Sequence, residues 1–327
     1  MKRKIGMAVL LVALLNVSNA KDYTQYYKLC NEALTYKALE KYQEAIETFN
    51  KAFALEFPFP DDINELKECY LVIGDKENAY QAARRMILCG YKFVSKIPVC
   101  GHPRVNIEYK ISLNDALLEQ KLESEYPFLR EQFLKQVDPE KDKWMEYCRN
   151  VESFIAIMRS MDYDGDENVK FEATILTYKT ELNLLINLFQ SDKKISREET
   201  DQWIDFRFVM GIIHASQTMG KPNLSFSDKE KLSLWLSLLK KHVKEGNLHP
   251  FQFAHISDML LDRQEKKTTY ATYYYTDFDE KTGTLIKTFS PINDIKNIDS
   301  IREEASLPPL WVFCKLKSFD LPKDYKY

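Results

Sequence analysis

The sequence has little glycine and lacks the short motifs with which many enzymes hold a phosphate or activate a nucleophile. It contains no GxSxG, GxGxxG, GxxxxGK[ST] or HExxH, and only nine of its 327 residues are glycine. No two cysteines stand close enough for a CxxC motif, so the sequence indicates neither a redox dithiol nor a zinc knuckle. Local sequence pattern therefore indicates no familiar enzyme class, and we expect no cofactor other than the cation considered below.

An excess of positive charge and a second long apolar run are also absent. The formal charge is −3, and without residues 1–20 the chain would keep 43 basic and 49 acidic residues. That balance argues against nucleic acid as a partner, which favours a basic stripe. Beyond residue 20 no apolar run approaches the roughly 20 residues of a membrane-spanning helix. We expect a mature chain that does not span a membrane.

The first 20 residues have the three parts of a cleavable secretory signal peptide. Basic Lys2-Arg3-Lys4 precedes an apolar run from Ile5 to Leu15, and a polar end, Ser18-Asn19-Ala20, offers small residues to signal peptidase. The pattern predicts export, to the periplasm or out of the cell. In an oxidising compartment Cys89 and Cys100, the nearest two cysteines, could form a disulfide; buried free thiols are the alternative.

A 34-residue period stands near the start of the mature chain. Tyr36 and Tyr70 are 34 residues apart, and so are Ala45 and Ala79. Small and aromatic residues recur around them at helical spacing, as is needed where one helix of a hairpin packs closely on the next. The pattern resembles the tetratricopeptide repeat, with repeats over residues 26–59 and 60–93. That resemblance implies stacked helical hairpins that bind a protein partner, and two unrelated helical hairpins are the alternative.

Two repeats cannot bury their own outer faces, so a downstream segment must cover them. Residues 113–135 carry apolar residues at helical spacing, and Pro127 is expected to start a second helix there. We interpret this segment as capping helices or a decayed third repeat, which completes a domain over residues 21–136. The charged, proline-containing residues 137–143 are the expected linker.

Residues 144–327 are expected to form a second, mostly helical domain of unknown function. Helices are predicted near residues 144–160, 170–190, 197–218 and 228–245, the last ending at Gly246. From Thr268 the residues become β-formers, and a glycine-containing turn predicts a β-hairpin near residues 268–289. The predicted fold class is mainly α: tetratricopeptide-like helical hairpins followed by a helical domain that carries a small C-terminal β-hairpin.

Three carboxylates at alternate positions, Asp162, Asp164 and Asp166, resemble the start of a calcium loop. The glycine and the final glutamate of that loop are missing, because Glu167 and Ala173 stand in their places. A solvated acidic turn between helices is therefore the first interpretation and a calcium site the second.

The C-terminal half is similar to a bacterial domain family of unknown function. The residues that carry this resemblance are Ile212-Ile213-His214-Ala215, Asp258, Tyr270-Ala271-Thr272-Tyr273, Asp294, Asp299, Arg302 and Ser306-Leu307-Pro308-Pro309-Leu310. Several polar or close-approach positions of the family differ here, at Met259, Thr268, Ala271 and Tyr273. The resemblance implies a retained fold with altered or lost activity.

Two function classes follow from these residues. The first is a non-enzymatic exported scaffold whose helical hairpins bind a protein, with ligand or partner contacts at His214, Asp258, Tyr270, Thr272 and Arg302 or at the exposed face of the tyrosine-rich strand. The second is a hydrolase with His214, Asp258 and Arg302 in a cleft. A hydrogen-bond network that only holds the hairpin on the helices is the structural interpretation of Asp258, Tyr270, Thr272 and Arg302.

Overall fold

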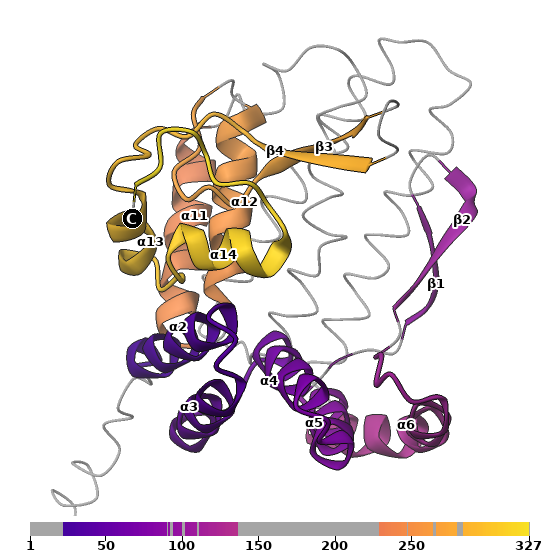
Figure 1. Ribbon diagram of the computed structural model, residues 1–327. Coiled ribbons are helices and arrows are strands. Elements are labelled where there is room, and N and C mark those ends of the chain that lie inside the picture. Colours follow the sequence, from indigo (N-terminus) through magenta and orange to yellow (C-terminus); the bar gives the residue numbers. More distant parts are fainter. Residues whose placement is uncertain are drawn as a thin grey trace, which may run out of the picture.

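The computed structural model describes residues 22–89, 91, 94–99, 102–109, 111–136, 229–246, 248–263, 266–279 and 284–326. Over these residues the chain is mainly helical, with two small antiparallel hairpins. In Figure 1 the helices α2 to α6 form a row, and α11 to α14 lie together over the α2 end of it. The signal peptide, the 137–143 linker, the three predicted helices between residues 144 and 218 and the calcium candidate lie outside the described residues.

Two successive helical hairpins confirm what the 34-residue period predicts. Helices α2 (Thr24–Ala38) and α3 (Tyr42–Leu55) form the first, and α4 (Pro60–Val72) and α5 (Lys76–Leu88) form the second. The turns repeat bond for bond: Lys41 N donates to Tyr36 O and Asp75 N donates to Tyr70 O, each at 2.9 Å. Glu40 and Gly74, also 34 residues apart, both adopt positive φ, at 62° and 80°.

Where the residues of the second hairpin differ from those of the first, their side chains still fill the same layer of the core. Ala45 and Ala79 are both fully buried, as close helix packing requires. Where the first hairpin buries Phe49 and Ala52, the second buries Ala83 and Met86 at the equivalent positions. The first hairpin has a large side chain followed by a small one, and the second has a small one followed by a large one. The total side-chain volume of the layer is therefore similar, and its packing is kept.

Helix α6 (Ala116–Gln136) covers the end of the row as one helix rather than the two expected. It continues through Pro127, so the prediction of a second helix there is wrong. Pro127 is solvent-exposed, and Leu122, Leu129 and Phe133 on either side of it are buried. Leu122 and Leu129 belong to the core, so both halves of the helix are held on it.

The direction of α6 excludes a third repeat. Lys76 pairs with Asp115 at 2.9 Å, and Arg84 pairs with Glu125 at 2.8 Å. Because the residue numbers increase in the same direction along both helices, α5 and α6 run parallel. The next helix of a repeat array would run antiparallel. The return crossing contains a hairpin that the sequence analysis missed, β1 (Val94–Val99) with β2 (His102–Tyr109), which stands near the α6 end of the row (Figure 1).

The C-terminal block consists of α11 (Lys229–Lys244), α12 (Pro250–Arg263), the hairpin β3 (Tyr274–Asp279) with β4 (Thr284–Phe289), α13 (Ile298–Glu304) and α14 (Leu310–Lys317). Helix α11 and the hairpin confirm the predictions there, while α12, α13 and α14 were not predicted. The hairpin is shorter than expected, because residues 268–273 form a loop rather than the start of a strand.

One hydrophobic core joins the helical hairpins to the C-terminal block. It runs from Tyr23 and Phe49 through Leu122 to Leu239 and Phe253. A smaller cluster lies under the β-hairpin and α14. The N-terminal hairpins are therefore covered on both sides, by α6 and by the C-terminal block, and their apolar faces are buried.

Polar contacts secure the same junction. Tyr27 donates its hydroxyl hydrogen to Val243 O at 2.7 Å, and Tyr23 N donates to Lys244 O at 3.1 Å. Lys37, nearly buried, pairs with Glu65, and Lys317 of α14 reaches the same carboxylate at 3.1 Å. Such partly buried ion pairs contribute little net stability, but they help to fix which surfaces meet.

Four cysteines lie in the described residues, and all are buried: Cys30, Cys69, Cys89 and Cys314. Cys100 lies outside them, so the Cys89–Cys100 disulfide stays a prediction. Burial is the main cause that raises the pKa of the Cys69 thiol to about 12 and that of Cys314 to about 11.

We predict that iodoacetamide at mildly alkaline pH labels Cys69 and Cys314 only after unfolding, because the thiolate is the reactive form and both groups are inaccessible. Peptide mass spectrometry of native and denatured samples measures the labelling. Equal labelling in both states would contradict the burial of these side chains.

Candidate functional site

A buried hydrogen-bond network is centred on Asp258 of α12. Its Oδ1 accepts hydrogen bonds from Thr269 N at 2.7 Å and Tyr270 N at 2.9 Å. Its Oδ2 accepts two more, from the amide and the hydroxyl of Thr272, both at 2.8 Å. Asp258 and Thr272 are fully buried. The carboxylate therefore draws residues 269–272 around itself, which explains why this segment is a loop.

Arg302 of α13 holds the same loop from the other side. Its Nη1 donates to Tyr270 O at 2.6 Å and its Nε donates to Pro308 O at 2.7 Å. The guanidinium is fully buried and lies over the Phe313 ring, 5.3 Å from the centroid. Desolvation is the main cause that lowers the pKa of Arg302 to about 10, so the group stays charged at neutral pH.

Four of the five predicted site residues thus meet in one network: Asp258, Tyr270, Thr272 and Arg302. His214 lies outside the described residues. Ala271, at the position where the resembled family has glycine, is fully buried and adopts φ of 53°, a conformation that favours glycine. The contacts of Asp258 and Arg302 on both sides hold the loop in this strained form.

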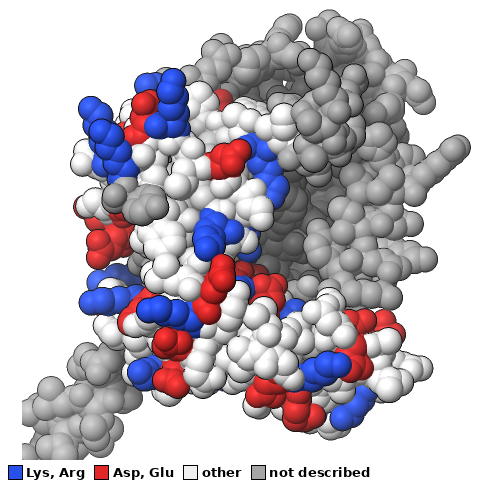
Figure 2. Space-filling model, viewed as in Figure 1, with Lys and Arg blue, Asp and Glu red and all other residues white. Residues whose placement is uncertain are grey.

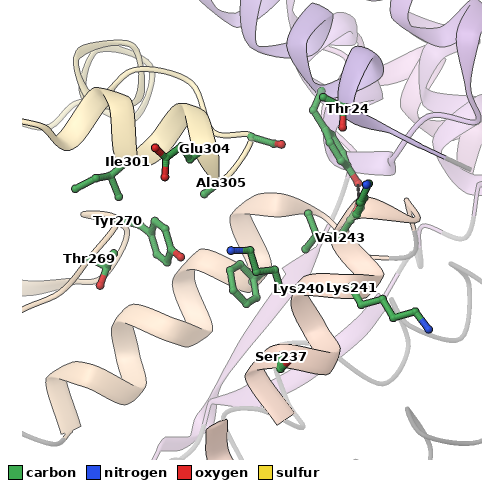
Figure 3. Close-up of a pocket in the computed structure, with 14 residues that line it drawn as sticks. Thr24, Ser237, Lys240, Lys241, Val243, Thr269, Tyr270, Ile301, Glu304 and Ala305 are labelled. Carbon is green, nitrogen blue, oxygen red and sulfur yellow. Dashed lines mark hydrogen bonds between the residues drawn. The ribbon is translucent and has the colours of Figure 1, made fainter. Parts of the chain in front are cut away.

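The network fixes the backbone of Tyr270, and its ring lines a pocket of about 510 Å³ (Figure 3). This volume lies within the range of small-molecule sites, roughly 300–1,000 Å³. Tyr27 from α2 and Phe253 from α12 supply further aromatic surface. Lys240 of α11 and Glu304 of α13 bring opposite charges to the same pocket.

The charged side chains that line the pocket differ in whether they have an ion-pair partner among the described residues. Lys241 and Lys244 approach Glu245 and Asp22, each at 3.8 Å. Within the described ranges, no ion pair or hydrogen bond involves the ammonium of Lys240, the carboxylate of Glu304 or the hydroxyl of Tyr270. No sequence motif marks these residues, because each one alone resembles an ordinary surface side chain.

A second feature is an edge of the helical row with exposed apolar side chains. Leu39 and Ile73 occupy the same position in successive turns and are 49% and 45% exposed. Val72 adjoins Ile73, and Leu117 follows Asp115, which pairs with Lys76 beside the second turn. We name Leu39, Val72, Ile73 and Leu117 the turn edge. Single exposed apolar residues are ordinary, but repetition along one edge indicates a contact surface.

The tyrosine-rich segment exposes Tyr275 on the β-hairpin, whereas Tyr273, expected on the same face, is partly buried against the core. Tyr274 packs on Phe319, with ring centroids 4.6 Å apart, while Tyr275 lies on the other face and is 46% exposed. The hydroxyl of Tyr275 donates to Asp262 of α12. This contact holds the hairpin against the helix.

Charge on the visible face is mixed. Figure 2 shows acidic and basic side chains interspersed over the described helices, without a large area of one sign. Among the described residues no group of three His, Cys, Asp or Glu side chains could hold a metal ion. No helix in the same part of the chain is both long and apolar enough to cross a membrane.

Comparison of the chain with protein-family models, with curated proteins and with solved structures found no match. The two family resemblances therefore stay predictions.

Proposed function

We propose that this protein is an exported interaction module whose stacked helical hairpins bind a protein partner at the turn edge. The observation that carries the proposal is the repetition of exposed apolar residues at equivalent turns, Leu39 and Ile73. Stacked hairpins offer such extended surfaces because each unit repeats its exposed positions along the row.

The hydrolase alternative has weaker support. The Asp258 carboxylate accepts four hydrogen bonds, so a role as general base would require it to break contacts that hold the 269–272 loop. Arg302 is likewise engaged with backbone carbonyls. The contacts of these two residues support a positioning role.

A photo-cross-linking experiment tests the turn edge. The full chain would carry benzoylphenylalanine at Ile73, or at exposed Glu47 on α3 as the control position. We predict that Ile73 cross-links one discrete protein in a cell-envelope extract and that Leu39→Asp with Leu117→Asp abolishes the product. An apolar contact of this size is worth a few kcal/mol, so two charges should reduce binding at least about tenfold. Equal products from both positions would contradict the proposal.

Export is tested separately. We predict that the chain secreted through a bacterial envelope begins at Lys21, because Ser18 and Ala20 suit signal peptidase. Intact-mass spectrometry of the envelope fraction reads the new terminus directly. A full-length chain that stays in the cytoplasm would contradict export and leave the turn-edge test unaffected.

A further inference from the structure

The pocket beside Tyr270 combines aromatic residues with one ammonium, of Lys240, and one carboxylate, of Glu304, that have no ion pair within the part of the chain that the structure describes. Lys241 and Lys244 also line the pocket, and they approach Glu245 and Asp22. Tyr27 is nearly fully buried, Phe253 lies 6.1 Å from Tyr270 between ring centroids, and both residues line the pocket. Apolar walls of this kind favour a ligand with an apolar side chain, and a few polar groups then set its orientation.

The two charges come from different elements. Figure 3 shows Lys240 on α11 and Glu304 at the end of α13, with Tyr270 beside them. The charge of Glu304 acts on Tyr270, whose pKa is raised mainly by burial and further by Asp258 and Glu304. An ammonium and a carboxylate at one pocket are complementary to a ligand that carries both a carboxylate and an ammonium.

The pocket is also rigid where the ligand would lie. The Tyr270 amide donates to Asp258, and its carbonyl accepts from Arg302, so the backbone is held on both sides of the ring. Because this wall is already ordered before binding, the entropic cost of binding is smaller. This gives the buried network a consequence beyond stability.

We propose that this pocket binds a short zwitterionic peptide with apolar side chains. Lys240 binds the C-terminal carboxylate, Glu304 binds the N-terminal ammonium, and Tyr27, Phe253 and Tyr270 surround the side chains. A larger protein would bring only one terminus to the pocket, so a free short peptide is the ligand that uses both charges. This site is separate from the turn edge.

Isothermal titration calorimetry with the dipeptide Phe-Phe tests the proposal. Phe-Phe amide lacks the carboxylate, and N-acetyl-Phe-Phe lacks the ammonium. We predict saturable binding of Phe-Phe and a loss of about fivefold to tenfold in affinity for each blocked form, as is typical of one charged contact at a half-open site.

Two variants separate the contacts. Lys240→Met should bind Phe-Phe and its amide equally, and Glu304→Gln should bind Phe-Phe and its N-acetyl form equally. Lys51→Met and Glu47→Gln on α3 change the same charges elsewhere and should keep the full discrimination. All four positions are exposed, so the variants should fold.

Absence of saturable Phe-Phe binding, or equal affinity for the free and blocked forms in the unsubstituted protein, would overturn the proposal. So would discrimination that survives both Lys240→Met and Glu304→Gln. Each of these results leaves the cross-linking test of the turn edge intact, because that edge shares no residue with the pocket.

Discussion

Replacing Asp258 by asparagine should lower the free energy of unfolding by about 3 kcal/mol, and replacing it by alanine should lower it by about 4 kcal/mol or more. Alanine leaves the buried amide and hydroxyl of Thr272 and the partly buried amides of Thr269 and Tyr270 without their acceptor. Asparagine keeps the shape but turns one acceptor into a donor that faces Thr269 and Tyr270 or Thr272. Equilibrium denaturation followed by circular dichroism measures both losses.

Asp262 provides the matched control for this prediction. It lies four residues later on the same helix and accepts a hydrogen bond from Tyr275, a residue that is 46% exposed. Asp262→Ala should cost no more than about 1 kcal/mol, because water can replace an exposed partner. If Asp258→Ala and Asp262→Ala cost the same, the buried network does not hold the C-terminal block together.

Replacing Gly246 by alanine should destabilise the protein by about 3 kcal/mol or more. Gly246 ends α11 with φ of 74°, and a Cβ atom there would lie 2.1 Å from ring atoms of Tyr23. Either the ring or the end of α11 must move, at the point where the first hairpin meets the C-terminal block. Overpacking of this kind adds to the roughly 1 kcal/mol that alanine costs at positive φ.

Gly74→Ala isolates the backbone part of that cost. Gly74 has φ of 80°, and a Cβ atom there would meet nothing within 4 Å. It should therefore lose only about 1 kcal/mol. Denaturant titration of the two variants measures the difference, and equal losses would show that Tyr23 does not pack against Gly246.

The sequence predicts those parts of the fold that depend on local periodicity. The spacing of Tyr36, Tyr70, Ala45 and Ala79 is enough to place four helices and both turns, because each hairpin repeats the same contacts. The periodic apolar residues that precede Gly246 are enough to place α11 for the same reason. Helices α13 and α14, of seven and eight residues, are too short to show a period.

Other elements depend on contacts that are distant in the sequence. The β-formers at residues 268–273 predict a strand, but the buried carboxylate of Asp258 takes their amides and makes a loop. Pro127 predicts a helix start, but the packing of α6 on α5 carries the helix through it. The parallel course of α6 follows from the β1–β2 crossing, which no periodic pattern marks.

The candidate site divides in the same way. Asp258, Tyr270, Thr272 and Arg302 could be singled out from the sequence by their spacing, although the family resemblance inferred from that spacing stays a prediction. The pocket could not, since Lys240 of α11 and Glu304 of α13 line one pocket only in the folded chain. Their chemistry depends on position rather than on residue type.

The helical hairpins and the C-terminal block share a single hydrophobic core. Hydrogen–deuterium exchange of the full chain tests it in the Asp258→Asn variant, where the change lies only in the C-terminal block. A shared core predicts faster amide exchange in α2 to α5 as well as in α12, by about the same free energy. Unchanged exchange in α2 to α5, with faster exchange confined to the C-terminal block, would contradict it.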